Sequence, residues 1–269
     1  MARYQVILAY DGSGFSGSQR QAASRTVQGE LENALRKVGW SGKSVIMAGR
    51  TDTGVHATGQ VAAFDFDEWT HPPQRLLQAI NAKLPSDLAV RNLRLVPAEF
   101  HPRFDAISRM YHYRLFCEPI RDPLREKFAW RVHPPVDGDA LKRNAELFLG
   151  THDFAAFGSP TSEKGTTVRT VTRSEWRKKR DGEWQFEVRA DAFLYRMVRR
   201  LVFVQVSLAQ GKVPVSEVRH ALKGQGRLPA GLAPAHGLTL VEVEYGSFGK
   251  ILKKRRDESA TEDVLSESR

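Results

Sequence analysis

Residues 44–66, SVIMAGRTDTGVHATGQVAAFDF, place a polar loop between two apolar segments. The flanking segments 44–47 and 60–66 have the composition of β-strands, and residues 48–57 of the loop between them include two glycines, Arg50, Asp52 and a histidine. A plain hairpin needs only about two to five connecting residues, whereas loops held between rigid strands often carry functional side chains. The spacing leaves two interpretations open: a surface hairpin with an internal Asp–Arg contact, or a site in which Arg50 favours the ionised form of the Asp52 carboxyl group.

The composition predicts a soluble, cytoplasmic protein of one large domain or two small ones. The 269 residues are enough to bury an adequate core. No apolar run reaches the roughly 18 residues of a membrane span, and the N-terminal segment has no signal-peptide pattern. The single cysteine, Cys117, excludes an internal disulfide and a cysteine-rich metal site, and we expect it to be a buried small hydrophobe. The net charge of +10 favours a polyanionic partner, most often nucleic acid.

The first part of the chain predicts a split βαβ unit. Its two amphipathic helices begin at the N-cap Thr26 and after Pro72, and Pro85 ends the second. The expected elements are a strand at 3–10, a helix from 26, strands at 44–47 and 60–66, a helix at 73–84 and a strand at 88–96. This order gives an antiparallel sheet covered by two helices on one side, an arrangement that many RNA-binding modules share.

The remaining chain predicts the same order of elements again. The expected elements are a strand at 108–117, a helix at 139–149, strands at 166–178 and 183–190, helices at 194–210 and 214–222 and a strand at 238–245. No sequence repeat accompanies this order, so we infer a structural duplication, and the expected fold class is α+β with two split-βαβ halves. Residues 250–269 are basic and then acidic and serine-rich, a composition typical of a disordered tail.

Several well-known catalytic and nucleotide-binding sites are not favoured by the sequence. Residues 12–17 match G-x-G-x-x-G, but no helix follows directly, so a dinucleotide site is not expected. The histidines lack metal-ligand spacing, no G-x-S-x-G occurs, and a single cysteine excludes a zinc-dependent base deaminase. Tyr111 and Tyr113 share one face of a strand, where aromatic side chains usually belong to the core.

The helix predicted at 194–210 contains three arginines in an apolar setting. We expect Arg200 to lie on the surface. Arg199 is surrounded in sequence by apolar residues, and a partly buried guanidinium needs an anionic partner. Asp52 is a candidate for that partner, although the spacing alone does not decide it.

Taken together, these motifs resemble the tRNA pseudouridine synthase A family. The resemblance is colinear over about residues 4–245 and rests on residues 10–15, 25–31, 48–57, 100–104, 111–113, 152–154, 193–199 and 235–238. It implies that Asp52 is the essential catalytic aspartate, with Arg50 as its partner in the loop and Arg199 as the basic residue paired with it. Tyr111 would cover the target base and is a candidate for removing the C5 proton. The other implied RNA-binding residues are Thr51, Arg103, Phe193 and Arg196.

The resemblance also implies an architecture and partners. Residues 1–104 and 105–247 would be two halves of one extended antiparallel sheet, with the active site in the cleft between them and a tail at 248–269. Family members are homodimers that bind tRNA and isomerise uridines at tRNA positions 38–40 of the anticodon stem-loop, without a metal or organic cofactor. The alternative is a non-catalytic RNA-binding or tRNA-chaperoning protein, which the charge and the element order also allow.

Three positions depart from the family pattern. Ser18 stands where the family usually has Trp, which leaves the local packing or stacking open. Thr53 replaces the usual Ala beside the candidate nucleophile. Phe203 occupies a position often held by Gly, so we expect the long helix to pack differently against its neighbour.

Overall fold

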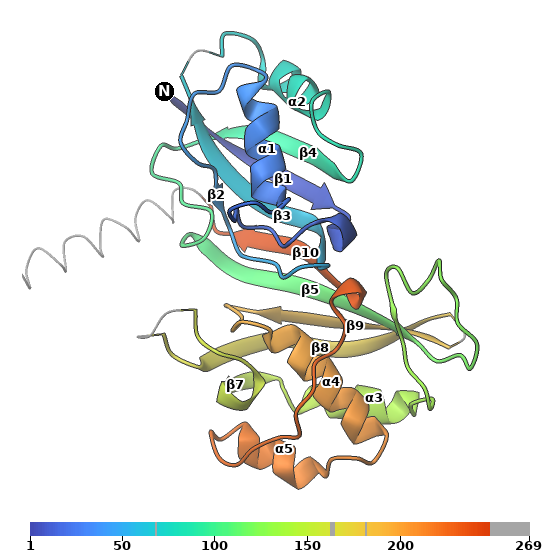
Figure 1. Ribbon diagram of the computed structural model, residues 1–269. Helices are drawn as coiled ribbons and strands as arrows, with labels where there is room; N and C mark the ends of the chain where they lie inside the picture. Colours follow the sequence, from blue (N-terminus) through green and yellow to red (C-terminus); the bar gives the residue numbers. More distant parts are fainter. Residues whose placement is uncertain (68, 162–164, 181, 248–269) are drawn as a thin grey trace, which may run out of the picture.

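Strands from both parts of the chain join into one sheet in the computed structural model, which describes residues 1–67, 69–161, 165–180 and 182–247 (Figure 1). Within these residues the strand order is β4-β1-β3-β10-β5-β9-β8-β7, with β2 beside β3 and β6 beside β5. Neighbouring strands are antiparallel except for two pairs, β3 with β10 and β5 with β6. The expected extended sheet is confirmed, and its two halves meet at a parallel pair.

The first half runs from β1 to β4. Its elements are β1 (Ala2–Tyr10), a 3-10 helix (Gly12–Gly14), α1 (Val27–Arg36), β2 (Ile46–Met47), β3 (His56–Phe66), α2 (Pro73–Asn81) and β4 (Leu88–Val96). The predicted order of strands and helices is confirmed. The predicted N-cap is confirmed too, because the Thr26 hydroxyl accepts a hydrogen bond from Gly29 N at 3.2 Å. Strand β3 begins four residues earlier than predicted, so His56 belongs to a strand.

Helix α2 ends at Asn81, three residues before the predicted end at Leu84. The Asn81 side chain donates to the Val90 carbonyl at 2.9 Å and accepts from Val90 N at 2.9 Å. These two bonds fasten the end of the helix to β4. The apolar stripes of both helices belong to one core with β1 and β3, through Leu31, Leu35, Leu76 and Ile80.

The second half runs from β5 to β10. Its strands are β5 (Ala106–Phe116), β6 (Trp130–Arg131), β7 (Gly150–Asp153), β8 (Val168–Arg180), β9 (Glu183–Ala190) and β10 (Leu238–Tyr245). Its helices are α3 (Gly138–Glu146), α4 (Met197–Ala209) and α5 (Val215–Ala221), with 3-10 helices at Ala155–Phe157 and Ala235–Gly237. The predicted order recurs, and the sequence did not predict the short strands β6 and β7. The N-cap of α3 is Asp137, whose side chain accepts from two backbone N–H groups.

Helix α4 begins at Met197, three residues after its predicted start. Arg196 has a φ of 63° and therefore lies in the left-handed region, outside the helix. Just before it, Tyr195 N donates to the Ser159 carbonyl at 2.9 Å. This contact with a distant segment competes with helix formation. The prediction that Arg196 lies on the same helix as Arg199 is wrong.

Strands β3 and β10 join the halves through only two residue pairs, His56 with Thr239 and Ala57 with Leu240. Each half has its own hydrophobic core, and each core receives residues from the other half. Leu240 of β10 packs in the first core, whereas Val55, just before β3, packs in the second. The junction is therefore stabilised by both cores.

Four further sequence predictions concern Cys117, the C-terminal tail, membrane-spanning segments and the division of the chain. Cys117 directly follows β5 and is half-buried, and burial raises the pKa of its thiol. The predicted tail, residues 248–269, lies outside the described residues. Among the residues that are described, no helix is long and apolar enough to cross a membrane. The division of the chain at residue 104 stays a prediction.

Candidate active site

The start of the loop between β2 and β3 is held by strand β3. Ala48 N donates to the Val61 carbonyl at 2.8 Å, and the Gln60 side chain donates to the Gly49 carbonyl at 2.9 Å. The tip is a turn closed by Val55 N, which donates to the Asp52 carbonyl at 3.1 Å. Gly54 occupies the third position of this turn with a φ of 79°, a conformation that favours glycine. Asp52 is therefore presented from a fixed turn.

The residue before Asp52 is fixed by a second segment of the first half. Thr51 N donates to Ser18 Oγ at 2.8 Å, and Ser18 N donates to the Thr51 carbonyl at 3.1 Å. The Thr51 hydroxyl is hydrogen-bonded to the Tyr10 hydroxyl at 2.9 Å. Both Ser18 and Thr51 are buried. The buried Thr51 side chain is hydrogen-bonded within the protein, and its predicted contact with RNA stays a prediction.

The glycine-rich segment 12–17 packs directly against the same loop. A Cβ atom at Gly12 would lie 2.0 Å from the Val55 carbonyl oxygen, so only glycine allows the two backbones to approach so closely. Gly12 N also donates to His56 Nδ1 at 3.0 Å. In this structure the G-x-G-x-x-G motif supports the loop that carries Asp52.

The carboxylate of Asp52 forms an ion pair with the second half of the chain. Arg199 Nη1, near the start of α4, lies 2.8 Å from Asp52 Oδ2. Arg199 Nε donates to the Ala233 carbonyl at 2.8 Å, which fixes the guanidinium. The side chains of Asp52 and Arg199 are 23% and 15% exposed, so the pair is largely shielded from water and still partly accessible to it. The suspected pairing of these two residues is confirmed.

Arg50 does not pair with Asp52, and that part of the prediction is wrong. Its side chain is exposed and makes no hydrogen bond or ion pair with any other described residue. In the turn, Arg50 and Asp52 are separated by the buried Thr51, whose contacts orient the backbone toward the interior. Arg50 is thus a cation available to a ligand.

Tyr111 of β5 lies on the sheet face that also carries Tyr113 and meets Phe193, with ring centroids 5.1 Å apart in an edge-to-face arrangement. Burial raises the pKa of the Tyr111 phenol well above its usual range, and the nearby Tyr10 and Asp52 add to the effect. The Tyr111 hydroxyl makes no hydrogen bond with a described residue. It is therefore a neutral O–H group beside the Asp52 carboxylate.

Comparison with known proteins shows the family to which this sequence belongs. A family model described as tRNA pseudouridine synthase matches residues 6–105 and 145–246, which include Asp52 and Arg199. The chain belongs to the tRNA pseudouridine synthase family. A tRNA pseudouridine synthase A from Shouchella clausii (strain KSM-K16) is 40% identical over 248 residues, 91% of this chain and 94% of that protein. Another from Methylacidiphilum infernorum (isolate V4) is 41% identical over 244 residues, 90% of this chain and 95% of that protein.

A further relative and a solved structure are also similar to this chain. The tRNA pseudouridine synthase A of Limosilactobacillus fermentum (strain NBRC 3956 / LMG 18251) is 38% identical over 256 residues, 92% of this chain and 97% of that protein. The crystal structure of the archaeal box H/ACA sRNP Nop10-Cbf5 complex is similar at 12% identity, with a TM-score of 0.36 over 68% of this chain and 39% of that chain. A structural similarity of that size adds nothing to family membership.

Two of the three departures from the family pattern have a structural account. Ser18, in place of the usual Trp, supplies the hydroxyl that accepts from Thr51 N. The ring of Phe203, where Gly is common, packs on the backbone of Gly231, in the segment that leads to the Arg199-binding carbonyl. Thr53 is exposed in the turn, and nothing in the structure explains its replacement of Ala.

Arg200 also supports that segment, which corrects the expectation that it lies free on the surface. It is half-buried and donates to the carbonyls of Gly231 at 2.8 Å and Leu228 at 3.2 Å. Burial lowers the pKa of its guanidinium. Arg199 and Arg200 together fix the segment before β10 onto helix α4.

Sequence reasoning missed Arg109, which lies two residues before Tyr111 on the same strand. Its guanidinium donates to the carbonyls of Asp191 at 2.9 Å, Arg103 at 2.6 Å and Ala106 at 3.3 Å. Burial lowers its pKa. The signal was available in the sequence, because residues two apart on a strand share a face. Arg109 ties the connector before β5 to the segment that carries Phe193.

His56 links the two halves behind the loop. Its Nε2 lies 3.1 Å from the His236 carbonyl, while Nδ1 is the acceptor for Gly12 N, so the proton belongs on Nε2 of a neutral ring. Burial lowers the pKa of His56 and outweighs the opposing effect of Asp11. The neutral histidine thus bridges the glycine-rich segment and the 3-10 helix before β10.

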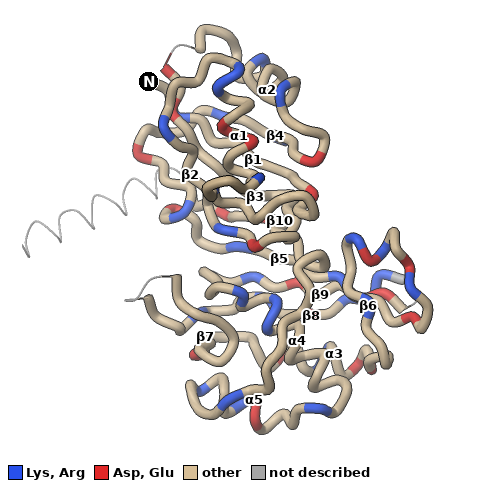
Figure 2. The backbone as a smooth tube through the Cα atoms, in the orientation of Figure 1, with Lys and Arg blue, Asp and Glu red and all other residues tan. Residues whose placement is uncertain are grey.

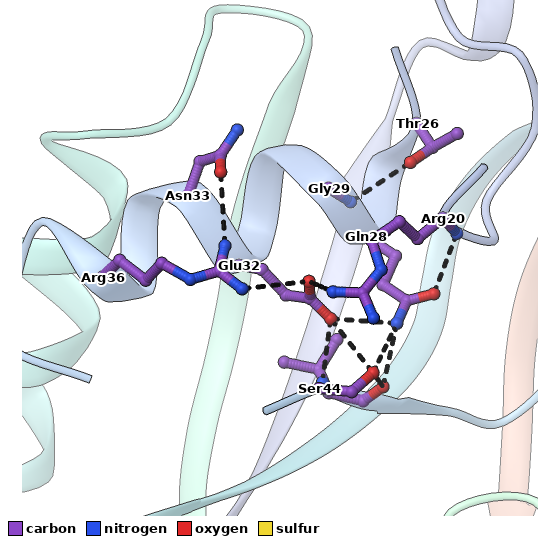
Figure 3. A network of polar contacts seen from close by, with 9 residues as sticks. Arg20, Thr26, Gln28, Gly29, Glu32, Asn33, Arg36 and Ser44 are labelled. Atoms are coloured by element: carbon purple, nitrogen blue, oxygen red, sulfur yellow. Dashed lines mark hydrogen bonds and ion pairs between the residues drawn. The ribbon is translucent and has the colours of Figure 1, made fainter. Parts of the chain in front are cut away.

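A buried carboxylate anchors the chain that enters the loop (Figure 3). Glu32 of α1 is fully buried and pairs with Arg20 at 2.7 Å and Arg36 at 3.5 Å. It also accepts from Val45 N at 3.1 Å and from the Ser44 hydroxyl at 3.2 Å. Helix α1 is thereby fastened to the residues just before β2. Among the described residues, no three His, Cys, Asp or Glu side chains form a group that could hold a metal ion.

Proposed function

We propose that this chain converts uridines at positions 38–40 of the tRNA anticodon stem-loop to pseudouridine, with Asp52 as the nucleophile. The observation that carries the proposal is the ion pair of Asp52 with Arg199 in a chain of this family. Arg199 engages Oδ2, and Oδ1 makes no hydrogen bond with the described residues, so one carboxylate oxygen is left for a substrate. A partly exposed carboxylate in a protein of charge +10 serves no purpose in binding a polyanion alone.

The reaction requires cleavage of the N1–C1′ bond, rotation of the freed uracil and formation of a C5–C1′ bond with loss of the C5 proton. An ionised carboxylate can act as a covalent nucleophile, and Asp52 can attack either C1′ or C6. Arg199 holds the carboxylate in position through the ion pair at Oδ2 before attack. Shielding from water strengthens this pairing and keeps the detached base in place.

The target base must leave its stack before Asp52 can reach it. Tyr111 and Phe193 provide an apolar wall against which the extruded base can lie. The raised pKa of Tyr111 keeps the phenol protonated at neutral pH, which supports a covering role and disfavours phenolate as the base for the C5 proton.

Positive charge on both halves supports tRNA binding (Figure 2). Arg50, Arg103 and Arg196 are exposed and have no carboxylate partner among the described residues. Contacts of such side chains with phosphates give salt-dependent affinity. We further propose that the protein works as a cytoplasmic homodimer, as the resemblance implies.

The test is carbodiimide-based pseudouridine mapping on unmodified tRNA transcripts treated with the wild type, Asp52→Asn and Asp52→Ala. Asp52→Asn keeps the shape of the side chain and removes its charge. Modification at positions 38–40 by the wild type alone would establish the activity and the nucleophile. Tight, salt-dependent binding without modification by any variant would favour the non-catalytic RNA-binding protein, and modification by all three would mean that another group is the nucleophile.

A further inference from the structure

Two exposed aromatic side chains lie next to arginines near the candidate site. Phe104 is 69% exposed and Tyr195 is 48% exposed. The Arg103 guanidinium lies 5.7 Å from the centre of the Phe104 ring, and that of Arg196 lies 4.7 Å from the Tyr195 ring. Aromatic rings beside cations are typical of nucleic-acid-binding surfaces.

The Phe104 ring stands on a rigid loop. His101 N donates to Asp105 Oδ2 at 2.8 Å, Asp105 N donates to the His101 carbonyl at 3.0 Å, and Phe104 N donates to His101 Nδ1 at 3.3 Å. The His101 ring stacks on one side of Phe104 with ring centroids 4.3 Å apart. Since the backbone and the ring are already ordered, binding a ligand here costs little conformational entropy.

The two aromatic–arginine pairs are connected by one short segment of the second half. Arg103 Nη2 lies 3.2 Å from Thr161 Oγ1, and Tyr195 pairs through its backbone with Ser159. We call Arg103, Phe104, Tyr195 and Arg196 the aromatic rim. The rim therefore spans both halves of the chain.

The rim adjoins the candidate active site through the backbone. Tyr195 is two residues from Phe193, which contacts Tyr111. On the other side, Arg109 joins the carbonyls of Arg103 and Asp191. A ligand on the rim is thus held by the same segments that form the wall beside Asp52.

We propose that the aromatic rim binds unpaired nucleotides of the RNA next to the uridine held at Asp52, with the rings of Phe104 and Tyr195 stacked on bases and the two arginines paired with phosphates. Neither guanidinium has a carboxylate partner among the described residues, so each can neutralise a phosphate. Bases in loops can be splayed out onto aromatic side chains, whereas paired bases cannot. This inference rests on the proposed function, since it assigns a further part of the same substrate.

The test uses the full chain and two RNA probes: a tRNA transcript with 2-aminopurine at an unpaired anticodon-loop position, and a fully paired duplex of similar length. Phe104→Ala and Tyr195→Ala are expected to weaken transcript binding about tenfold each and to relieve the quenching of 2-aminopurine. Phe104→Trp and Tyr195→Phe should retain the wild-type transcript affinity and the quenching of 2-aminopurine. Duplex affinity should be the same for all four variants. Leu124→Ala, at an exposed apolar residue between β5 and β6, is the matched control and should behave as the wild type.

Wild-type transcript affinity and quenching in both alanine variants would overturn the inference, as would an equal loss of affinity for the duplex. Pseudouridine formation by the wild type is measured separately and decides the proposed function. Loss of stacking in a protein that forms no pseudouridine would support the rim and refute the proposed activity. Unchanged stacking in a protein that does form pseudouridine would refute the rim alone.

Discussion

Replacing Gly12 with alanine should displace the loop that carries Asp52. The new Cβ would lie 2.0 Å from the Val55 oxygen and 2.5 Å from the Val55 carbonyl carbon, whereas ordinary contact begins at 3.4 Å. Both neighbours are backbone atoms, so one of the two segments must move by about 1 Å or more. Val55 closes the turn of Asp52, and a misplacement of about 1 Å at a reacting group can cost roughly a hundredfold in rate.

The assay is single-turnover pseudouridine formation on a tRNA transcript, with tRNA affinity and thermal unfolding measured on the same protein. We expect Gly12→Ala to lower the rate about a hundredfold with tRNA affinity kept, and to lose about 1–3 kcal/mol of stability through overpacking. Gly49→Ala is the matched control, because a Cβ there meets nothing within 4 Å. A Gly12→Ala protein that folds and reacts at the wild-type rate would show that Asp52 does not depend on this contact.

Two further predictions concern Ser18, which accepts from Thr51 N in the loop, and Asp11, which forms an ion pair with Lys127. Ser18→Ala leaves the buried Thr51 N–H without its acceptor, which should cost about 1–3 kcal/mol in urea unfolding and slow pseudouridine formation; an unchanged rate would contradict this role. Burial raises the pKa of Asp11, but its bonds to Lys127 and Ser13 outweigh burial and lower it to about 2 from the ordinary 3.8. The ionised Asp11 thus stabilises the fold fully above about pH 4, and this contribution is lost as the pH falls toward 2. Wild type should lose about 1 kcal/mol more than Lys127→Met over that range, since the lysine is half exposed; equal losses would refute the assignment.

Local sequence patterns were sufficient where the structure depends on local contacts. The strand at 88–96 and the cap at Thr26 were predicted with their observed positions, because alternation and capping act within a few residues. The start of α4 was missed because the backbone contact of Tyr195 with Ser159 holds the preceding residues outside the helix. No periodicity in the segment itself encodes that contact.

In the candidate site, too, the sequence alone did not decide contacts that depend on residues far apart in the chain. The loop was recognised from its composition, and the spacing within it suggested a contact of Asp52 with the neighbouring Arg50 that the structure does not show, whereas the suspected pairing with Arg199 is confirmed. The observed partner, Arg199, is 147 positions away and reaches Asp52 only because β3 and β10 join the two halves. Arg199 could be suspected from sequence because a guanidinium among apolar residues needs an anion. The close approach of Gly12 to Val55 could not be predicted from the sequence, because it depends on the backbone geometry of two loops.

The position of Asp52 depends on contacts from both halves of the chain. The backbone of Asp52 is fixed by the first half, through Thr51 and Ser18, whereas its carboxylate is held by the second half, through Arg199. At the junction, β3 and β10 share two residue pairs, and side chains such as His56 also join the halves. A relative shift of the halves would lengthen the Asp52–Arg199 contact while leaving the loop intact. If RNA contacts both halves as proposed, bound RNA would oppose that shift and favour the geometry in which Arg199 holds the Asp52 carboxylate.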